Sequence, residues 1–252
     1  MATLPLSPAA AKDRQAATGL LLGGAIAAAY LILHIYAVFF LDLSGLGLLA
    51  APFLVAALCW LNVGLFIVAH DCMHGSLAPG RRNTNLWVGR VAMLLYAGFW
   101  YDRFLAKHHA HHRHAGTADD PDFAENHPTR FWPWYLAFFR EYFGLREFAV
   151  LFAISWTYML VLGAPVPNLL LFWALPSILS SLQLFGFGTF LPHRHEGPDG
   201  AHGFGDRHMA RSNDFHPLLS LLTCFHFGYH HEHHRAPHQP WWRLPAERRG
   251  VS

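Results

Sequence analysis

Long apolar runs alternate with polar segments along the chain, and four of these runs are candidates to cross a bilayer. They cover residues 16–41, 46–69, 148–163 and 168–191. The first run has about 26 residues, more than the ~20 that a helix needs to cross the hydrocarbon core. Only a few residues separate the first run from the second and the third from the fourth. The pattern therefore predicts two antiparallel pairs of membrane-spanning helices.

Two further segments mix apolar, aromatic and charged residues and are predicted to lie at the membrane surface. Residues 85–101 form an apolar stretch that is short for a span and contains Arg90. Its Trp87 and Trp100 suit the headgroup level, where tryptophan is enriched. Residues 131–147 have a similar mixture of aromatic and charged side chains. We expect residues 85–101 to form an interfacial or re-entrant helix and residues 131–147 to form an interfacial helix.

The composition agrees with a membrane protein and not with a nucleic-acid-binding one. Hydrophobic residues make up 53% of the chain and charged residues only 13%, about half of the ~25% found in soluble proteins. The formal net charge of +2 is too small to indicate nucleic acid. Three cysteines without a CxxC pair indicate neither a disulfide framework nor a zinc ribbon. The expected fold is one all-α domain, residues 1–252, with four transmembrane helices in two hairpins, interfacial helices and a histidine-rich cap.

The distribution of basic residues predicts which side of the membrane carries the cap. The two hairpin turns, residues 41–47 and 163–168, contain no Lys or Arg. All 18 basic residues therefore lie on the other side or in the interfacial segments. Because cytoplasmic loops carry the excess of Lys and Arg, that side is expected to be cytoplasmic. Every histidine-rich segment emerges on the same side. Residues 1–15 precede an apolar run without a small-residue cleavage site, so we expect a retained anchor.

Three histidine-rich segments have the spacing of residues that share one face of a helix. His108, His111 and His112 lie at positions i, i+3 and i+4. The same spacing recurs at positions 230, 233 and 234, and a two-histidine version lies at 70 and 74. Imidazole suits zinc, copper, iron and nickel, so three such segments can surround metal ions. The eight candidate ligands are His70, His74, His108, His111, His112, His230, His233 and His234.

Eight imidazoles are too many for a single ion, since a catalytic zinc needs only three protein ligands. His193, which follows the fourth apolar run, is a ninth candidate ligand. Neighbouring residues on a helix point about 100° apart, so His111 and His112 can serve two different ions. The sequence therefore predicts a centre with two metal ions. His34 stands alone within the first apolar run and is expected to be a packing residue.

Other polar residues near the boxes are candidates to orient the ligands. A ligating imidazole commonly donates its second N–H to a carboxylate. Two carboxylates lie inside the boxes, and a third follows Pro121. Two histidines lie off the shared helical faces, and the one four residues before His230 stays an alternative ligand. The candidates for this orienting role are Asp71, Asp122, His226, His231 and Glu232.

The three boxes together resemble a known superfamily. They read HDCMH, HHAHHRH and HFGYHHEHH, which is similar to the boxes of the membrane di-iron superfamily of fatty-acid desaturases and hydroxylases. The flanking residues resemble the bacterial β-carotene ketolases more closely, and the resemblance covers nearly the whole chain. The segments that carry it are residues 70–75, 120–123, 187–194 and 225–234.

The resemblance implies an O₂-dependent oxygenase of the bacterial inner membrane, with two iron ions held by the nine histidines on the cytoplasmic side. It would hydroxylate the C4 methylene of a β-ionone ring twice, and the geminal diol would lose water to leave a 4-keto group. β-Carotene would give echinenone and then canthaxanthin, and zeaxanthin would give astaxanthin. Electrons would come from a separate protein such as reduced ferredoxin. The polyene would lie in an apolar tunnel, for which the candidates are Phe99, Trp100, Trp132, Trp134 and Phe187.

Two alternatives remain open at this point. An acyl-lipid desaturase or a carotenoid ring hydroxylase would use the same irons with a different pocket, and box spacing does not separate these activities. A histidine-rich metal transporter is the alternative of another class. Transport needs polar groups along the spans, and the apolar runs carry almost none besides His34.

Overall fold

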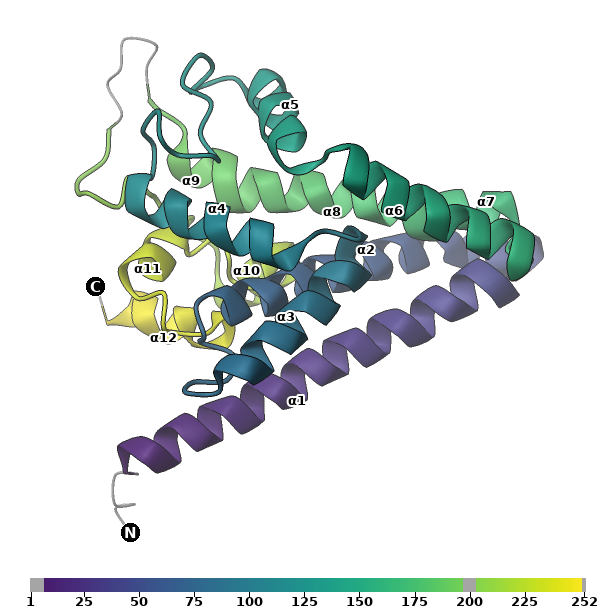
Figure 1. The fold of residues 1–252 in the computed structure, drawn as a ribbon, viewed down its shortest axis with the longest axis horizontal. Coiled ribbons are helices and arrows are strands. Elements are labelled where there is room, and N and C mark those ends of the chain that lie inside the picture. Colours follow the sequence, from purple (N-terminus) through teal and green to yellow (C-terminus); the bar gives the residue numbers. More distant parts are fainter. Residues whose placement is uncertain (1–6, 197–202, 251–252) are drawn as a thin grey trace.

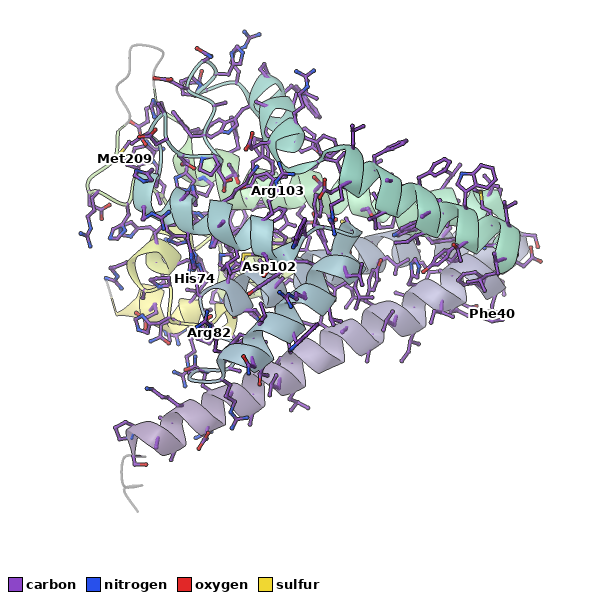
Figure 2. All side chains as sticks on the ribbon, in the orientation of Figure 1. Phe40, His74, Arg82, Asp102, Arg103 and Met209 are labelled. Atoms are coloured by element: carbon purple, nitrogen blue, oxygen red, sulfur yellow. The ribbon has the colours of Figure 1, made fainter. Side chains whose placement is uncertain are left out.

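The computed structural model describes residues 7–196 and 203–250, and every regular element in these residues is a helix. Long helices converge toward one end of the molecule, where the hairpin turns lie, and the short helices and loops gather at the other end (Figure 1). Phe40 lies at the turn end, far from His74 and Met209 (Figure 2). The all-α expectation is therefore correct for the described residues.

The first hairpin consists of α1 (Pro8–Ile35), a π-helical turn η1 (Tyr36–Phe40) and α2 (Gly45–Met73). The second begins with α6 (Leu145–Trp156) and η2 (Thr157–Val161) and returns through α7 (Val166–Leu169), η3 (Leu170–Ala174), α8 (Leu175–Phe185), η4 (Gly186–Phe190) and α9 (Leu191–His193). The two turns are tied together. The Asn168 side chain donates to the backbone carbonyls of Ala37 and Leu41, at 2.9 and 2.8 Å.

Three helical segments are long and apolar enough to cross a membrane: Pro8–Phe40, Gly45–Met73 and Val166–His193. A fourth candidate is Leu145–Val161, which qualifies only together with the preceding helix, from which it departs at 80°. Large apolar side chains such as Leu21, Ile32 and Phe53 stand exposed on these helices. Exposure of large apolar side chains to water is unfavourable, so this surface indicates contact with lipid. The chain is a membrane protein with three or four candidate spans.

The central helix of the bundle is α2. Within its most apolar window 56% of the residues are buried, against 28% in α1 and 33% in the last span. Its Leu58, Val63 and Leu65 are fully enclosed and form the middle of the main apolar core. Because its neighbours hold it on several sides, α2 provides a fixed base for His70 and His74 at its end.

Prolines explain the two π-helical turns of the last span. Proline has no N–H, and its ring clashes with the carbonyl four residues earlier, so the helix must widen there. Pro176 follows η3 and Pro192 follows η4. Short π-helical turns are frequent at functional sites, and η4 lies directly before His193.

The predicted interfacial segments differ from the observed helices at their ends. Residues 85–101 do not form one helix, because α3 (Arg82–Ala97) stops at Gly98, which has a φ of 68°. The next helix, α4, covers Tyr101–His114. The break is held by Arg90, whose guanidinium donates to both carboxylate oxygens of Asp102 at 3.1 and 3.2 Å. Instead of lying apart at the surface, α3 packs along α2.

Residues 131–147 likewise divide into two helices. α5 covers Phe131–Tyr142, and the chain then turns by 80° into α6. Glu147 stabilises the start of α6, since its carboxylate accepts from the backbone N–H of Gly144 at 3.0 Å. The bend leaves α5 across the histidine-rich end and directs α6 along the bundle (Figure 1).

The C-terminal part folds back onto the end of α2 and onto α4. It contains α10 (Pro217–Cys224), α11 (His230–Arg235), η5 (Trp241–Arg243) and α12 (Leu244–Arg249). Phe225 and His226 have φ values of 47° and 63°, and this left-handed pair reverses the chain between α10 and α11. The reversal brings α11 beside α4 and α9 (Figure 1).

Candidate metal centre

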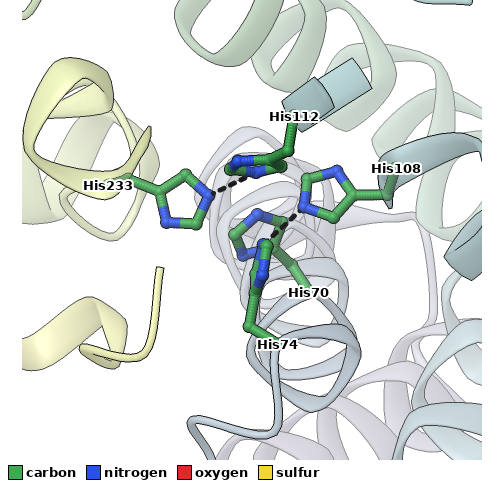
Figure 3. Close-up of side chains that lie close together, drawn as sticks. All are labelled: His70, His74, His108, His112 and His233. Carbon is green, nitrogen blue, oxygen red and sulfur yellow. Dashed lines mark hydrogen bonds between the residues drawn. The ribbon is translucent and has the colours of Figure 1, made fainter. Parts of the chain in front are cut away.

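Five of the predicted histidines form one cluster between three helices. His70 and His74 come from the end of α2, His108 and His112 from α4, and His233 from α11 (Figure 3). One ring nitrogen of each lies within 4.8 Å of those of the others. The Nε2 atoms of His74 and His108 are 2.6 Å apart, and those of His112 and His233 are 3.0 Å apart. We name this group cluster A.

The other four predicted histidines form a second, buried cluster beside the first. His111 comes from α4, His193 from α9, and His230 and His234 from α11. Their nearest ring nitrogens also lie within 4.8 Å of one another. The Nε2 atom of His234 is 3.2 Å from that of His111 and 3.0 Å from that of His230. We name this group cluster B.

Helical geometry divides neighbouring histidines between the two clusters. On α4, His111 belongs to cluster B and His112 to cluster A; on α11, His233 belongs to cluster A and His234 to cluster B. The division follows from the 100° turn between successive helical residues. The rings of His112 and His234 stack with centroids 4.2 Å apart, so the two clusters are adjacent. Neighbouring histidines of one helix thus lie in two adjacent clusters, as their spacing predicts.

The donor sets fit metal ions better than hydrogen bonds alone. When two imidazole nitrogens face each other, only one of them can supply the hydrogen. Two nitrogens that bind one ion through bonds of ~2.1 Å at right angles lie about 3 Å apart, as several of these pairs do. In the described part of the chain, the Nε2 atoms of His70 and His193 are buried without a hydrogen-bond partner. Both belong to the clusters, where an ion would satisfy them.

The electrostatic environment favours the neutral imidazole, which is the form that binds metals. Burial lowers the pKa of His108, His233 and His234 well below the usual value, and neighbouring imidazoles lower it further. For His112 these effects bring the pKa to about 2. A cation in the centre of cluster A would therefore meet free nitrogen lone pairs rather than bound protons. His111 of cluster B differs, because burial lowers its pKa but Asp120 and Asp122 raise it above the usual value.

Asp120 orients His111 and was not among the residues that the sequence analysis selected. The Nδ1 of His111 donates to its two carboxylate oxygens at 2.9 and 3.0 Å, which directs Nε2 into cluster B. Asp120 also accepts from the backbone N–H groups of Gly116 and Asp122, at 2.8 and 2.9 Å. Burial raises the pKa of Asp120, but His111 and these N–H groups hold it below the usual value.

Asp122, the carboxylate of this loop that the sequence predicted for the orienting role, lies farther from His111 than Asp120 does. Its nearer oxygen is 3.8 Å from Nδ1 of His111, and it accepts a hydrogen bond from the Tyr142 hydroxyl. Sequence spacing alone did not separate the two aspartates. A second orienting contact is made by a backbone group: His193 Nδ1 donates to the carbonyl of Met209 at 2.7 Å.

The remaining predicted orienting residues have different partners. Asp71 lies 3.7 Å from Nδ1 of His70 and accepts from the backbone N–H of Trp241 at 3.1 Å. Glu232, by contrast, bonds to Ser212 and to Arg248, so it holds α11 in place rather than a cluster imidazole.

His231 and His226 do not contact the clusters in the predicted way. His231 faces outward and pairs with Asp206 at 2.7 Å. His226 stacks on Tyr229 and Trp241 and belongs to neither cluster. The alternative that His226 is a ligand is therefore wrong. The reason is the left-handed backbone at His226, because the i, i+4 argument from His230 holds only within a continuous helix.

An apolar cavity reaches the clusters from the bundle side. His70, His108, His111 and His230 line its inner end. Phe66, Phe104, Tyr142 and Phe227 are among the aromatic residues of its walls. Gly188 is needed beside Phe227, since a Cβ there would lie 2.2 Å from the phenylalanine ring.

Of the five aromatic residues predicted to line a tunnel, only Phe99 lines this cavity. Trp100 and Trp132 are exposed. Trp134 is enclosed elsewhere and donates its indole N–H to the carbonyl of Asp122 at 2.7 Å. Phe187 lies on a separate surface pocket. The aromatic pattern alone did not show which ring faces which side of a helix.

The helical membrane fold and the paired histidine clusters define a class of membrane proteins with two adjacent histidine clusters that could hold metal ions. The family model for fatty acid desaturase matches residues 43–154 and 140–252, so the chain belongs to the fatty acid desaturase family.

Three relatives of this chain are named as carotenoid ketolases. The chain is 53% identical over 234 residues to the β-carotene ketolase of one Paracoccus strain, which covers 92% of this chain and 93% of that protein. It is 51% identical over 229 residues to the β-carotene ketolase of a second Paracoccus strain, covering 90% and 91%. The zeaxanthin 4-ketolase of Chlamydomonas reinhardtii is 41% identical over 187 residues, covering 74% of this chain and 41% of the alga's protein. No solved structure matches the chain.

Proposed function

We propose that this protein is a β-carotene ketolase, an oxidoreductase that uses O₂ to convert the C4 methylene of a β-ionone ring into a ketone. The observation that carries the proposal is the 53% identity to a β-carotene ketolase along 92% of the chain. The apolar cavity that ends on the two histidine clusters supports it. The substrate is oil-soluble, and such a cavity receives it without passing it through water.

The proposed cofactor is a pair of iron ions. Cluster A, with His70, His74, His108, His112 and His233, would hold one ion; cluster B, with His111, His193, His230 and His234, would hold the other. Iron supplies the redox chemistry with O₂ that no side chain can replace. The nitrogen spacings near 3 Å and the buried, unpartnered nitrogens support this assignment.

Each hydroxylation of the ring inserts one oxygen atom of O₂ into a C–H bond and reduces the other atom to water, which consumes two electrons and two protons. A second hydroxylation at the same carbon gives a geminal diol, and loss of water leaves the ketone. The electrons are proposed to come from a separate protein. Reduced ferredoxin is the proposed class of donor.

The residues around the clusters have separate tasks in this scheme. Asp120 keeps the proton of His111 on Nδ1 and so leaves Nε2 free for the ion. The Met209 carbonyl does the same for His193. The aromatic walls exclude water and hold the ring near the clusters.

The proposed membrane arrangement has four spans, and both hairpin turns lie on the outer side. These turns, residues 41–47 and 163–168, contain none of the 18 basic residues, and positive charge remains on the cytoplasmic side. The clusters lie at the opposite end of the bundle from the turns (Figure 2). This supports a site on the cytoplasmic face of a bacterial inner membrane, built by residues 1–252 as one domain.

Pigment analysis tests the proposed activity. We expect cells that make β-carotene and express this chain to accumulate echinenone and canthaxanthin, and the purified protein to hold about two irons per chain. The checks are chromatography of the pigments and metal analysis of the same preparation. A 4-hydroxylated pigment without ketone would point to a ring hydroxylase, and unchanged β-carotene with desaturated lipids to a lipid desaturase. Metal flux into vesicles without any oxidised product would point to a transporter.

A further inference from the structure

A second cavity lies next to the one that reaches the histidine clusters. The inner cavity contains the clusters, and the outer cavity is bounded by α3, α5, α6 and α8. Both are lined by the same five residues: Tyr96, Phe99, Phe139, Phe143 and Ser181. Because four of these are aromatic, we name this shared part the aromatic neck. The two cavities are therefore neighbours that share these residues.

Both cavities follow one face of the last span. The outer cavity is lined by Trp173, Ala174, Ser177, Ile178 and Ser181, and the inner one by Ser181, Leu184, Phe185, Gly188 and Thr189. These positions recur every three or four residues, which is the spacing of one helical face. From residue 173 to residue 189 is 16 steps, or about 24 Å at 1.5 Å per residue. The lining thus extends along roughly 24 Å of this helix face.

The outer cavity opens toward lipid. Ile178 lines it and is 56% exposed on a helix that crosses the membrane. Phe139 in α5 and Phe143 at the 80° bend between α5 and α6 also line it. The few polar groups are hydrogen-bonded: the hydroxyl of Ser181 pairs with that of Tyr135 at 3.1 Å, and that of Ser177 donates to the Trp173 carbonyl at 2.7 Å. An apolar molecule meets no charged side chain along this part.

We propose that the two cavities are one carotenoid-binding tunnel, with the reacting ring at the clusters, the polyene through the aromatic neck along α8, and the entrance from the bilayer beside Ile178. This rests on the proposed ketolase function. A long apolar polyene suits a lining that extends along about 24 Å of one helix face, and its flat π system suits aromatic walls. A lipid acyl chain would bring a charged headgroup, for which the outer cavity offers no charged partner among the residues that line it.

Neighbouring residues on α8 provide a matched test. Ile178 lines the outer cavity, whereas Leu179 is 38% exposed and does not line it. We expect Ile178→Trp to narrow the entrance and lower β-carotene binding by roughly tenfold or more, while Leu179→Trp leaves it unchanged. Ser177→Phe, which places a ring deeper in the outer cavity, should lower β-carotene binding more than Ile178→Trp does. Binding is measured on the iron-loaded full chain in lipid nanodiscs, as carotenoid retained per protein after gel filtration, with iron content on the same samples.

The outcomes of these experiments distinguish a failure of the proposed tunnel from a failure of the proposed ketolase function. If the wild type binds β-carotene but makes no ketone, the proposed function fails and the tunnel stands. If the wild type makes ketones, and Ile178→Trp and Ser177→Phe bind and convert β-carotene as well as it does, the tunnel is wrong. The iron content shows whether a variant is correctly folded. A variant that keeps its two irons but no longer binds carotenoid supports the tunnel. Should Ser177→Phe lose iron, the comparison of Ile178→Trp with Leu179→Trp decides.

Discussion

Replacing His111 by alanine is expected to remove the ion of cluster B and to lower ketone formation more than ~100-fold, beyond the usual effect of losing only an orienting partner. His111 is one of four imidazoles of that cluster, and it connects the cluster to Asp120. Its removal leaves three ligands and an unpaired buried carboxylate. The measurements are iron per chain and ketocarotenoid per cell.

The control lies three residues farther along the same helix. His114 is exposed and belongs to neither cluster, so His114→Ala should retain both irons and near-normal ketone formation. An equal loss in both variants would indicate damage to α4 rather than to a ligand. Full activity and two irons in His111→Ala would contradict the metal assignment.

The second large effect is expected for Asp120→Asn. The amide keeps the size of the side chain but loses the charge, and its NH₂ group cannot accept from the backbone N–H groups of Gly116 or Asp122. Loss of such an orienting carboxylate costs 10- to 100-fold, roughly, in metal affinity. We expect iron to be removed at correspondingly lower chelator concentrations, with a parallel decrease in activity.

The neighbouring residue again supplies the control. Asp119 is exposed, whereas Asp120 is buried, so Asp119→Asn should behave as the wild type in the chelator titration. If the two variants release iron alike, the contact between Asp120 and His111 has no role in holding the ion.

The sequence predicted the histidine clusters well because their spacing is local. Positions i, i+3 and i+4 on α4 and α11 determine which nitrogens point together, and helix geometry carries this information without knowledge of the fold. The four apolar runs also correspond closely to observed helices, since bilayer thickness sets their length. Both predictions rest on regular periodicity.

Features that depend on the ends of helices were harder to predict. Gly98 divides one expected helix into α3 and α4, and the left-handed pair at Phe225 and His226 removes His226 from the face of His230. The choice between Asp120 and Asp122 depends on a turn in which Asp120 accepts from a backbone N–H two residues later. Such loops are set by tertiary contacts, and the sequence pattern contains no period that reveals them.

The tunnel lining was also missed, for a different reason. Aromatic residues are frequent throughout the chain, and many anchor the protein at the membrane surface. The last span also contributes small residues to the lining, Ala174 and Ser177 in the outer cavity and Gly188 in the inner one, and these leave room beside the helix. Small side chains leave empty space beside a helix, and a count of aromatic residues does not reveal this space.

The tunnel places the histidine clusters at one end only, and this matters for a substrate whose two halves are identical. While one ring reacts, the other points along the passage toward the lipid. A stiff conjugated rod of this length cannot turn around inside such a tunnel. The half-oxidised pigment must therefore return to the bilayer, reverse its direction and bind again, so the diketone is made in two separate visits. In the pigment analysis, echinenone should accordingly appear before canthaxanthin.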